Sequence, residues 1–184
     1  NYGTALPGIE NVTATTTVGE GSTFYVGDAV AGIVIEVSGS ESDPLIRAIG
    51  EIGLDYHYPD TQKEKQKEWF AMQIDLAKRL HLPILVHSRD AAADTLDLIK
   101  AENAGDAGGV LHCFSYEPEM AKIYTDMGFY IGIGGVVTFK NARKLKEVAA
   151  QMPLELMLLE TDCPYLAPVP NRGKRNSSLN LSVV

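Results

Sequence analysis

The sequence predicts an α/β protein in which parallel strands alternate with helices. Short apolar runs recur after residue 44, stretches of helical periodicity separate them, and four of the five runs lead into Glu, His or Asp. Strands that are joined through helices pair in parallel, with right-handed crossovers. Periodicity alone fits both an open doubly wound sheet and part of a (β/α)8 barrel.

Residues 1–44 differ from the rest, and we predict a domain boundary after them. This stretch has no Lys or Arg but six acidic residues, so it carries −6 of the net charge of −8. Its Thr, Val and Gly content predicts two or three short strands with glycine turns. Residues 38–43 (SGSESD) have the composition of a linker. We therefore separate an acidic, β-rich segment, 1–44, from an α/β domain, 45–184.

The elements expected in the domain follow in chain order. Apolar runs predict strands at 46–52, 83–86, 109–111, 129–133 and 156–159. Helical periodicity predicts helices at 61–80, 91–100, 117–127 and 141–151. In the first helix, Thr61 and Glu64 have the spacing of a capping box. Its apolar face is expected to hold Trp69, Met72, Leu76, Ala77 and Leu80.

Composition restricts the function classes. A net charge of −8 argues against a broad basic surface for nucleic acid, but an enzyme that holds one phosphate through metal ions needs no such surface. No secretory signal and no membrane-spanning apolar run are present. Cys113 and Cys163 could form a disulfide, but free thiols in a reducing cytoplasm are favoured.

Polar residues at the ends of the strands indicate a site. Glu51, His87, His112 and Asp162 each follow an apolar run. In parallel α/β folds the carboxyl ends of the strands form the ligand site, so these side chains are expected to converge. Imidazole nitrogen and carboxylate oxygen bind Zn²⁺, Mn²⁺ or Mg²⁺. A bound ion of this kind lowers the pKa of coordinated water and offsets charge on a phosphoryl oxygen.

Structural roles are the alternative for each of these residues. A single His at a strand end is more often a hydrogen-bonded structural residue, and a single carboxylate more often a helix cap. Four together favour a metal site, because burying them without a cation is costly. Arg89 could hold a substrate phosphate or equally pair with Asp90 or Asp94. Asp55 could orient Glu51 or cap a turn.

Glycine also marks one strand end. Gly132, Gly134 and Gly135 lack the lysine of a phosphate-binding loop, so a backbone turn is the favoured interpretation.

Six motifs carry a family resemblance. GEIGLDY, VHSRDA, GVLHCF, GFYIGIGGVVTFKN, LLETDCPYLAP and PNRGKRN resemble the TatD family of metal-dependent hydrolases, over about residues 46–176. The resemblance implies a (β/α)8 TIM-type barrel of the amidohydrolase kind, of which five strands are recognisable. It also implies hydrolysis of DNA phosphodiester bonds, often from the 3′ end of single strands, with two divalent ions (Mg²⁺, Mn²⁺ or Zn²⁺).

The resemblance assigns a role to each site residue. Glu51 would bridge the metals, His87 and His112 would ligate one of them, and Asp162 would ligate the other and help to activate water. Glu51 and Asp162 are thus the expected catalytic residues, and Arg89 the expected substrate ligand. The family's His-x-His pair is missing, since residues 1–44 contain no His. At least one ion is therefore expected here.

Three functions stay open at this point. The leading hypothesis is a metal-dependent deoxyribonuclease whose substrate is single-stranded DNA. A barrel remnant without catalysis, acting as a binding module, is favoured by the missing His-x-His pair. A related amide or ester hydrolase keeps the metal and changes the substrate. The open edges of an incomplete barrel also predict a homodimer, or coverage of an edge by residues 1–44.

Overall fold

A five-stranded parallel sheet forms the framework of the protein in the computed structural model, which describes residues 17–18, 38–39 and 47–184. The strands are β3 (Ile49–Asp55), β4 (Ile84–Arg89), β5 (Gly109–Leu111), β6 (Phe129–Ile133) and β7 (Met157–Leu159). The helices between them are α1 (Lys63–Leu80), α2 (Ala92–Ala101), α3 (Pro118–Asp126) and α4 (Arg143–Gln151).

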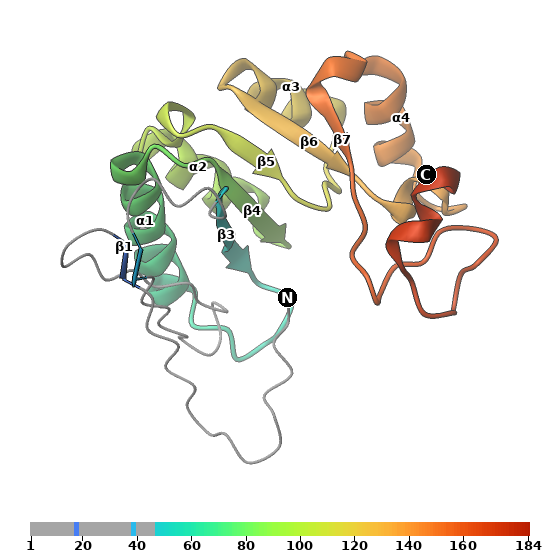
Figure 1. Ribbon diagram of the computed structural model, residues 1–184, viewed down its shortest axis with the longest axis horizontal. Coiled ribbons are helices and arrows are strands. Elements are labelled where there is room, and N and C mark those ends of the chain that lie inside the picture. The colour runs from blue at the N-terminus through green and yellow to red at the C-terminus, as the bar shows by residue number, and fades with distance from the viewer. Residues whose placement is uncertain (1–16, 19–37, 40–46) are drawn as a thin grey trace.

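The order of the strands distinguishes a barrel segment from a doubly wound sheet. The strands lie side by side in chain order, from β3 to β7, without the reversal of a doubly wound fold. Because right-handed crossovers that advance in one direction place their helices on one face, the other face stays free. Figure 1 shows this arrangement as an arch with the helices along its outer side. The predicted partial (β/α)8 barrel is confirmed.

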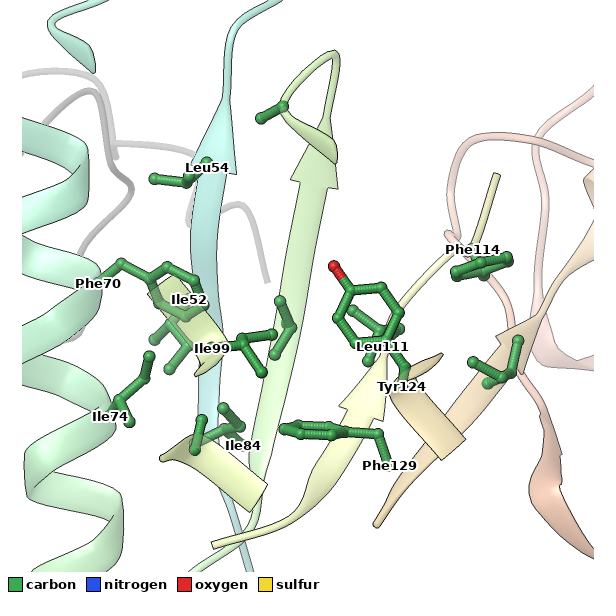
Figure 2. Packing of buried hydrophobic residues seen from close by; sticks show 14 of the residues in the cluster. Ile52, Leu54, Phe70, Ile74, Ile84, Ile99, Leu111, Phe114, Tyr124 and Phe129 are labelled. Atoms are coloured by element: carbon green, nitrogen blue, oxygen red, sulfur yellow. The ribbon is translucent and has the colours of Figure 1, made fainter. Parts of the chain in front are cut away.

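The hydrophobic core lies between this sheet and the helices. In Figure 2, Phe70 and Ile74 of α1 extend toward Ile52 and Leu54 of β3, and all four side chains are buried. Burying one such side chain stabilises the fold by about 1.5–3 kcal/mol. The core continues through α2, α3 and the other strands with Ile84, Ile99, Leu111, Phe114, Tyr124 and Phe129.

The inner face of the arch is also apolar, but it is open. Leu85, Val110 and Tyr130 are aligned across β4, β5 and β6. Side chains alternate along a strand, so these three point away from the helices. Leu85 and Tyr130 are 38% and 42% exposed. In a closed barrel this face is the packed interior.

The first helix corrects two predictions. It begins at Lys63, two residues later than expected, and no side chain caps it. The capping box is therefore wrong, and the Thr61 hydroxyl is buried without a hydrogen-bond partner among the described residues. Met72 is 44% exposed, so the predicted face was also wrong there. The buried face is formed by Gln66, Phe70, Gln73, Ile74, Leu76 and Ala77.

The other boundaries agree with the expected ranges to within two residues, except at both ends of β3 and at the end of β4. Strand β3 begins at Ile49, three residues after its predicted start. Strand β3 extends to Asp55 and β4 to Arg89, three residues beyond the predicted ends. His87 therefore lies inside β4 instead of after it, while Glu51 lies inside β3 as the predicted range had it. Four 3-10 helices in the described residues were not predicted. They are η1 (Ala104–Asp106), η2 (Gly135–Thr138), η3 (Leu154–Leu156) and η4 (Ser178–Val183).

Little of the N-terminal segment can be compared with its prediction. Strands β1 (Thr17–Val18) and β2 (Ser38–Gly39) pair in parallel. Ser38 and Gly39 therefore form a strand where the sequence predicted a linker. The remaining predicted strands, the glycine turns and the domain boundary lie outside the described residues. None of the described helices is long and apolar enough to span a membrane.

Candidate metal centre

Glu51 reaches the inner face through a bulge in β3. In the pairing with β4, Gly50 aligns with Leu85 and Ile52 with Val86, so Glu51 has no partner of its own. Ile49 and Ile52 both belong to the buried core, although residues three apart on a regular strand point to opposite faces. The extra residue absorbs this mismatch, and such bulges commonly re-aim a side chain at a functional site.

The structure brings the four predicted site residues together. Glu51 Oε1 lies 3.0 Å from His87 Nδ1 and 3.6 Å from His112 Nε2. His112 Nε2 also lies 3.5 Å from Asp162 Oδ1. Glu51 is thus placed between two imidazoles, and the second imidazole connects it to the aspartate. We refer to Glu51, His87, His112 and Asp162 as the rim cluster.

Two further carboxylates contact the rim cluster. Asp55 Oδ2 lies 3.2 Å from His87 Nε2. Glu160 Oε2 contacts His112 Nδ1, and Glu160 Oε1 accepts a hydrogen bond of 2.7 Å from the Cys113 backbone. Asp55 therefore contacts His87, and not Glu51 as one sequence interpretation had it. Glu160 was missed, although it directly follows the apolar run that forms β7 and satisfied the strand-end criterion better than Asp162.

The close contacts favour the charged forms of these groups. Burial favours neutral Glu51, but the hydrogen bond to His87 and the positive charge of His112 outweigh it, and the pKa of Glu51 is lowered. Burial also opposes charging of His112, but hydrogen bonds to Asp162 and Glu160 raise its pKa to about 10. Against burial, the hydrogen bond to Glu51 raises the pKa of His87. The short contacts between the imidazoles and the carboxylates thus outweigh the opposing effect of burial in all three groups.

The donor atoms suit a divalent cation. Carboxylate oxygen and imidazole nitrogen are ligands of Mg²⁺, Mn²⁺ and Zn²⁺. The donors now bond to one another, and among the described residues no group of three or more His, Cys, Asp or Glu side chains is set as a ready-made ion site. Carboxylates nevertheless outnumber imidazoles here, since Glu51, Asp55, Glu160 and Asp162 face two rings. A cation would enter by displacing protons that these groups share.

Arg89 is placed at the end of β4 with an exposed side chain. Neither of the acidic partners weighed from the sequence binds it. Asp90 pairs with His57, and Asp94 pairs with Lys67 at 2.8 Å and accepts a hydrogen bond from Tyr56. Within residues 47–184, Arg89 has no ion-pair partner, so its guanidinium is available to an anion.

The two cysteines are free thiols. Cys113 adjoins His112, but burial, followed by the charge of Glu160, raises the pKa of its thiol to about 12. Because the thiolate is the nucleophilic form, Cys113 is not suited to nucleophilic chemistry.

Comparison with known proteins gives a family match. The profile of the family described as "TatD related DNase" matches residues 28–184. The "uncharacterized metal-dependent hydrolase YabD" of Bacillus subtilis is 52% identical over 129 residues, which are 70% of this chain and 51% of that protein. The "uncharacterized metal-dependent hydrolase YcfH" of Escherichia coli is 50% identical over the same length, 70% of this chain and 49% of that protein.

A solved structure supports the same relationship. The crystal structure of YjjV, described as a TatD homologue from Escherichia coli, matches with a TM-score of 0.71 at 35% identity. The match covers 75% of this chain and 53% of that one. The chain therefore spans about half the length of the curated relatives and of the solved structure that it matches.

Proposed function

Because the chain belongs to the TatD family, we propose that it is the metal-binding part of a hydrolase that cleaves phosphodiester bonds in single-stranded DNA. The observation that carries the proposal is the rim cluster, in which a glutamate lies within 3.6 Å of two imidazoles. The names of the relatives support metal-dependent hydrolysis, and the name of the family supports DNA as the substrate.

At least one divalent ion would be held by Glu51, His87 Nδ1, His112 Nε2 and Asp162, since these are the atoms that face one another. When bound, such an ion acidifies water and withdraws charge from a phosphoryl oxygen. Mg²⁺, Mn²⁺ and Zn²⁺ are all compatible with this mixture of oxygen and nitrogen.

Asp162 is the residue best placed to take the proton of the attacking water. Its carboxylate follows β7 and its side chain is 31% exposed, so one oxygen can face a substrate while the other faces His112. The water oxygen bonds to phosphorus, its proton passes to Asp162, and the bond from phosphorus to the leaving sugar oxygen breaks. The leaving oxygen then takes a proton from solvent.

Arg89 is proposed to bind a phosphate of the substrate. A free guanidinium can form two parallel hydrogen bonds to one phosphate. Arg89 lies two residues after His87 on β4, and its backbone carbonyl accepts a hydrogen bond from the Tyr56 N–H, which fixes this strand end against β3.

Three further properties belong to this proposal. The enzyme cleaves from the 3′ end, it acts in the cytoplasm, and two copies pair through the edge strands β3 and β7.

A binding module without catalysis is the second candidate. It is supported by the absence of His from residues 1–44 and by the bonding of both rim imidazoles to carboxylates. A cluster with fewer ligands than the family's would bind an ion weakly. No feature of the described residues specifically supports the third hypothesis, hydrolysis of an amide or an ester.

One assay separates these functions. Labelled single-stranded DNA is incubated with the protein and Mn²⁺, and with the Glu51→Gln and Glu155→Gln variants. Glu155 is exposed in η3, so it provides the same chemical change away from the cluster. Shortening of the DNA by wild type and Glu155→Gln, but not by Glu51→Gln, supports the nuclease. No shortening by folded wild-type protein at high concentration rejects it and favours the binding module.

A further inference from the structure

We propose that Asp55 and Glu160 are positioning residues, which hold His87 and His112 by the ring nitrogens that face away from Glu51. The proposal rests on the proposed metal-binding function of the rim cluster. Each imidazole has one ring nitrogen toward carboxylates of the rim cluster and the other toward a carboxylate outside it, which is Asp55 for His87 and Glu160 for His112.

The first pair joins β3 to β4. His87 Nδ1 lies 3.0 Å from Glu51 Oε1, and His87 Nε2 lies 3.2 Å from Asp55 Oδ2. Both carboxylates come from β3, Glu51 from the bulge itself and Asp55 from the end of the strand. Asp55 is itself fixed, because Gln66 of α1 bonds to both its backbone N–H and its backbone carbonyl, at 2.8 and 3.0 Å. The ring of His87 therefore has one orientation.

The buried Gln66 explains how this orientation is maintained. Its side chain is 1% exposed and belongs to α1, so the helix holds the end of β3 through two hydrogen bonds. The outer oxygen of Asp55, Oδ1, accepts a 2.9 Å hydrogen bond from the His57 N–H. Asp55 is thus held at its backbone and at one carboxylate oxygen, and its other oxygen is directed to His87.

The second pair joins β5 to β7. His112 Nε2 faces Glu51 and Asp162, while His112 Nδ1 contacts Glu160. The other oxygen of Glu160 is bonded to the Cys113 N–H at 2.7 Å. A single carboxylate therefore holds both the ring of His112 and the backbone of the next residue.

Two glycines, one in β6 and one just after it, lie against this carboxylate. A Cβ atom at Gly132 would lie 3.1 Å from Glu160 Oε1, and one at Gly134 would lie 3.5 Å from the same oxygen. The sequence interpretation of these glycines as a backbone turn is therefore incomplete. Gly132 also provides the close approach that Glu160 needs to cross β6 and reach His112.

The physical consequence concerns the proton of each ring. A carboxylate that accepts an N–H bond keeps the proton on that nitrogen and leaves the lone pair on the opposite one. Asp55 thus favours a His87 with its lone pair on Nδ1, and Glu160 a His112 with its lone pair on Nε2. Both lone pairs then face Glu51, which is the arrangement that a shared cation requires.

The test compares the Asp55→Asn and Glu160→Gln variants with the wild type, by calorimetric titration with Mn²⁺. The controls are Asp60→Asn and Glu155→Gln. Asp60 is exposed in the loop between β3 and α1, and Glu155 is exposed in η3, just before β7. Loss of such an orienting partner typically weakens metal affinity by about 10- to 100-fold, and this is the expected result for both variants. The controls are expected to bind as wild type does.

Nitrogen NMR of the histidine rings provides a second readout that a purely structural role would not change. With Zn²⁺ bound to the wild type, the remaining ring proton is expected on Nε2 of His87 and on Nδ1 of His112. In Asp55→Asn the His87 signals, and in Glu160→Gln the His112 signals, are expected to broaden or shift toward the other tautomer. Without metal, the same variants are expected to alter the same ring signals.

The outcomes separate this inference from the proposed function. Unchanged Mn²⁺ affinity and unchanged ring signals in both variants overturn the positioning roles and leave the metal site standing. A wild type that binds neither ion contradicts the proposed function, and the metal-free ring signals still decide whether Asp55 and Glu160 hold the imidazoles. Circular dichroism shows whether each variant is folded.

Discussion

The backbone of Gly53 lies so close to that of His87 that a Cβ atom on Gly53 would be 1.9 Å from the His87 carbonyl oxygen. Gly53 also has a φ of +139°, which side-chain-bearing residues rarely adopt. The approach of β3 to β4 beyond the bulge therefore depends on glycine. It is this approach that places Asp55 and Glu51 on the two sides of the His87 ring.

Gly53→Ala is accordingly expected to destabilise the fold strongly. Strained backbone combined with a clash against another backbone should cost about 4 kcal/mol or more of unfolding free energy. Urea denaturation measures the difference. Gly173→Ala is the matched control, because Gly173 has a φ of +83° but nothing within 4 Å of the added Cβ. An equal loss in both variants would contradict the role of the close approach.

Phe70→Ala tests the corrected face of α1. Phe70 is fully buried against β3, and truncating such a residue removes about 3–5 kcal/mol of stability. Met72→Ala, at the position that the sequence wrongly placed in the core, should change stability by only about 0.5 kcal/mol. Thermal or urea unfolding of the two variants compares them, and similar losses would favour the original helix face.

Acid sensitivity is expected from the pair of Asp94 and Lys67. Hydrogen bonds from Lys67 and Tyr56 lower the pKa of Asp94 below its ordinary value of 3.8. A lowered pKa means that the carboxylate contributes stability above pH 3.8, and that this contribution is lost as the pH falls through the lowered value. Asp94→Asn should therefore lose stability at neutral pH and show a shallower decline in acid.

The measurement for this prediction is the unfolding free energy as a function of pH, from neutral to below pH 3. Asp97→Asn removes the same charge at an exposed position one helical turn further along α2. If the two variants show the same pH dependence, the pair of Asp94 and Lys67 does not contribute as described.

Metal binding should appear as thermal stabilisation. An ion present at 100 times its dissociation constant stabilises the folded state by about 2.7 kcal/mol. Mn²⁺ should therefore raise the melting temperature of the wild type by several degrees, and a chelator should reverse the effect. Glu51→Gln should melt at the same temperature with and without Mn²⁺. A shift that persists in this variant would place the ion elsewhere.

Arg89→Gln should weaken binding of single-stranded DNA. Removing one phosphate contact is expected to reduce the slope of log affinity against log salt by about 0.7 for a single strand. Fluorescence anisotropy at several salt concentrations measures both quantities. Arg79→Gln is the control, since Arg79 lies at the end of α1 and pairs with Asp75. Equal effects of the two substitutions would argue for general electrostatics and against a phosphate site at Arg89.

Local patterns in the sequence were sufficient for the order of the elements. Apolar runs and helical periodicity depend on neighbouring residues, so strands such as Gly109–Leu111 and Phe129–Ile133 were predicted with their observed bounds. The strand-end rule likewise selected Glu51, His87, His112 and Asp162, because parallel strands bring their carboxyl ends to a common edge.

Long-range packing decided what these patterns could not. The bulge at Glu51 exists only in the pairing of β3 with β4. The buried face of α1 is set by the side chains of β3 toward which Phe70 and Ile74 extend. Strand order, which excluded a doubly wound sheet, is a property of the assembled chain.

The sequence by itself thus determined which elements form, which family the chain resembles and which four polar side chains share a rim. Only the tertiary structure decided that Asp55 and Glu160 hold the two imidazoles, because each contact joins different strands. These contacts depend on the close approach of two backbones at Gly53 and on the space left by Gly132. Hydrophobic periodicity along the sequence predicts neither feature.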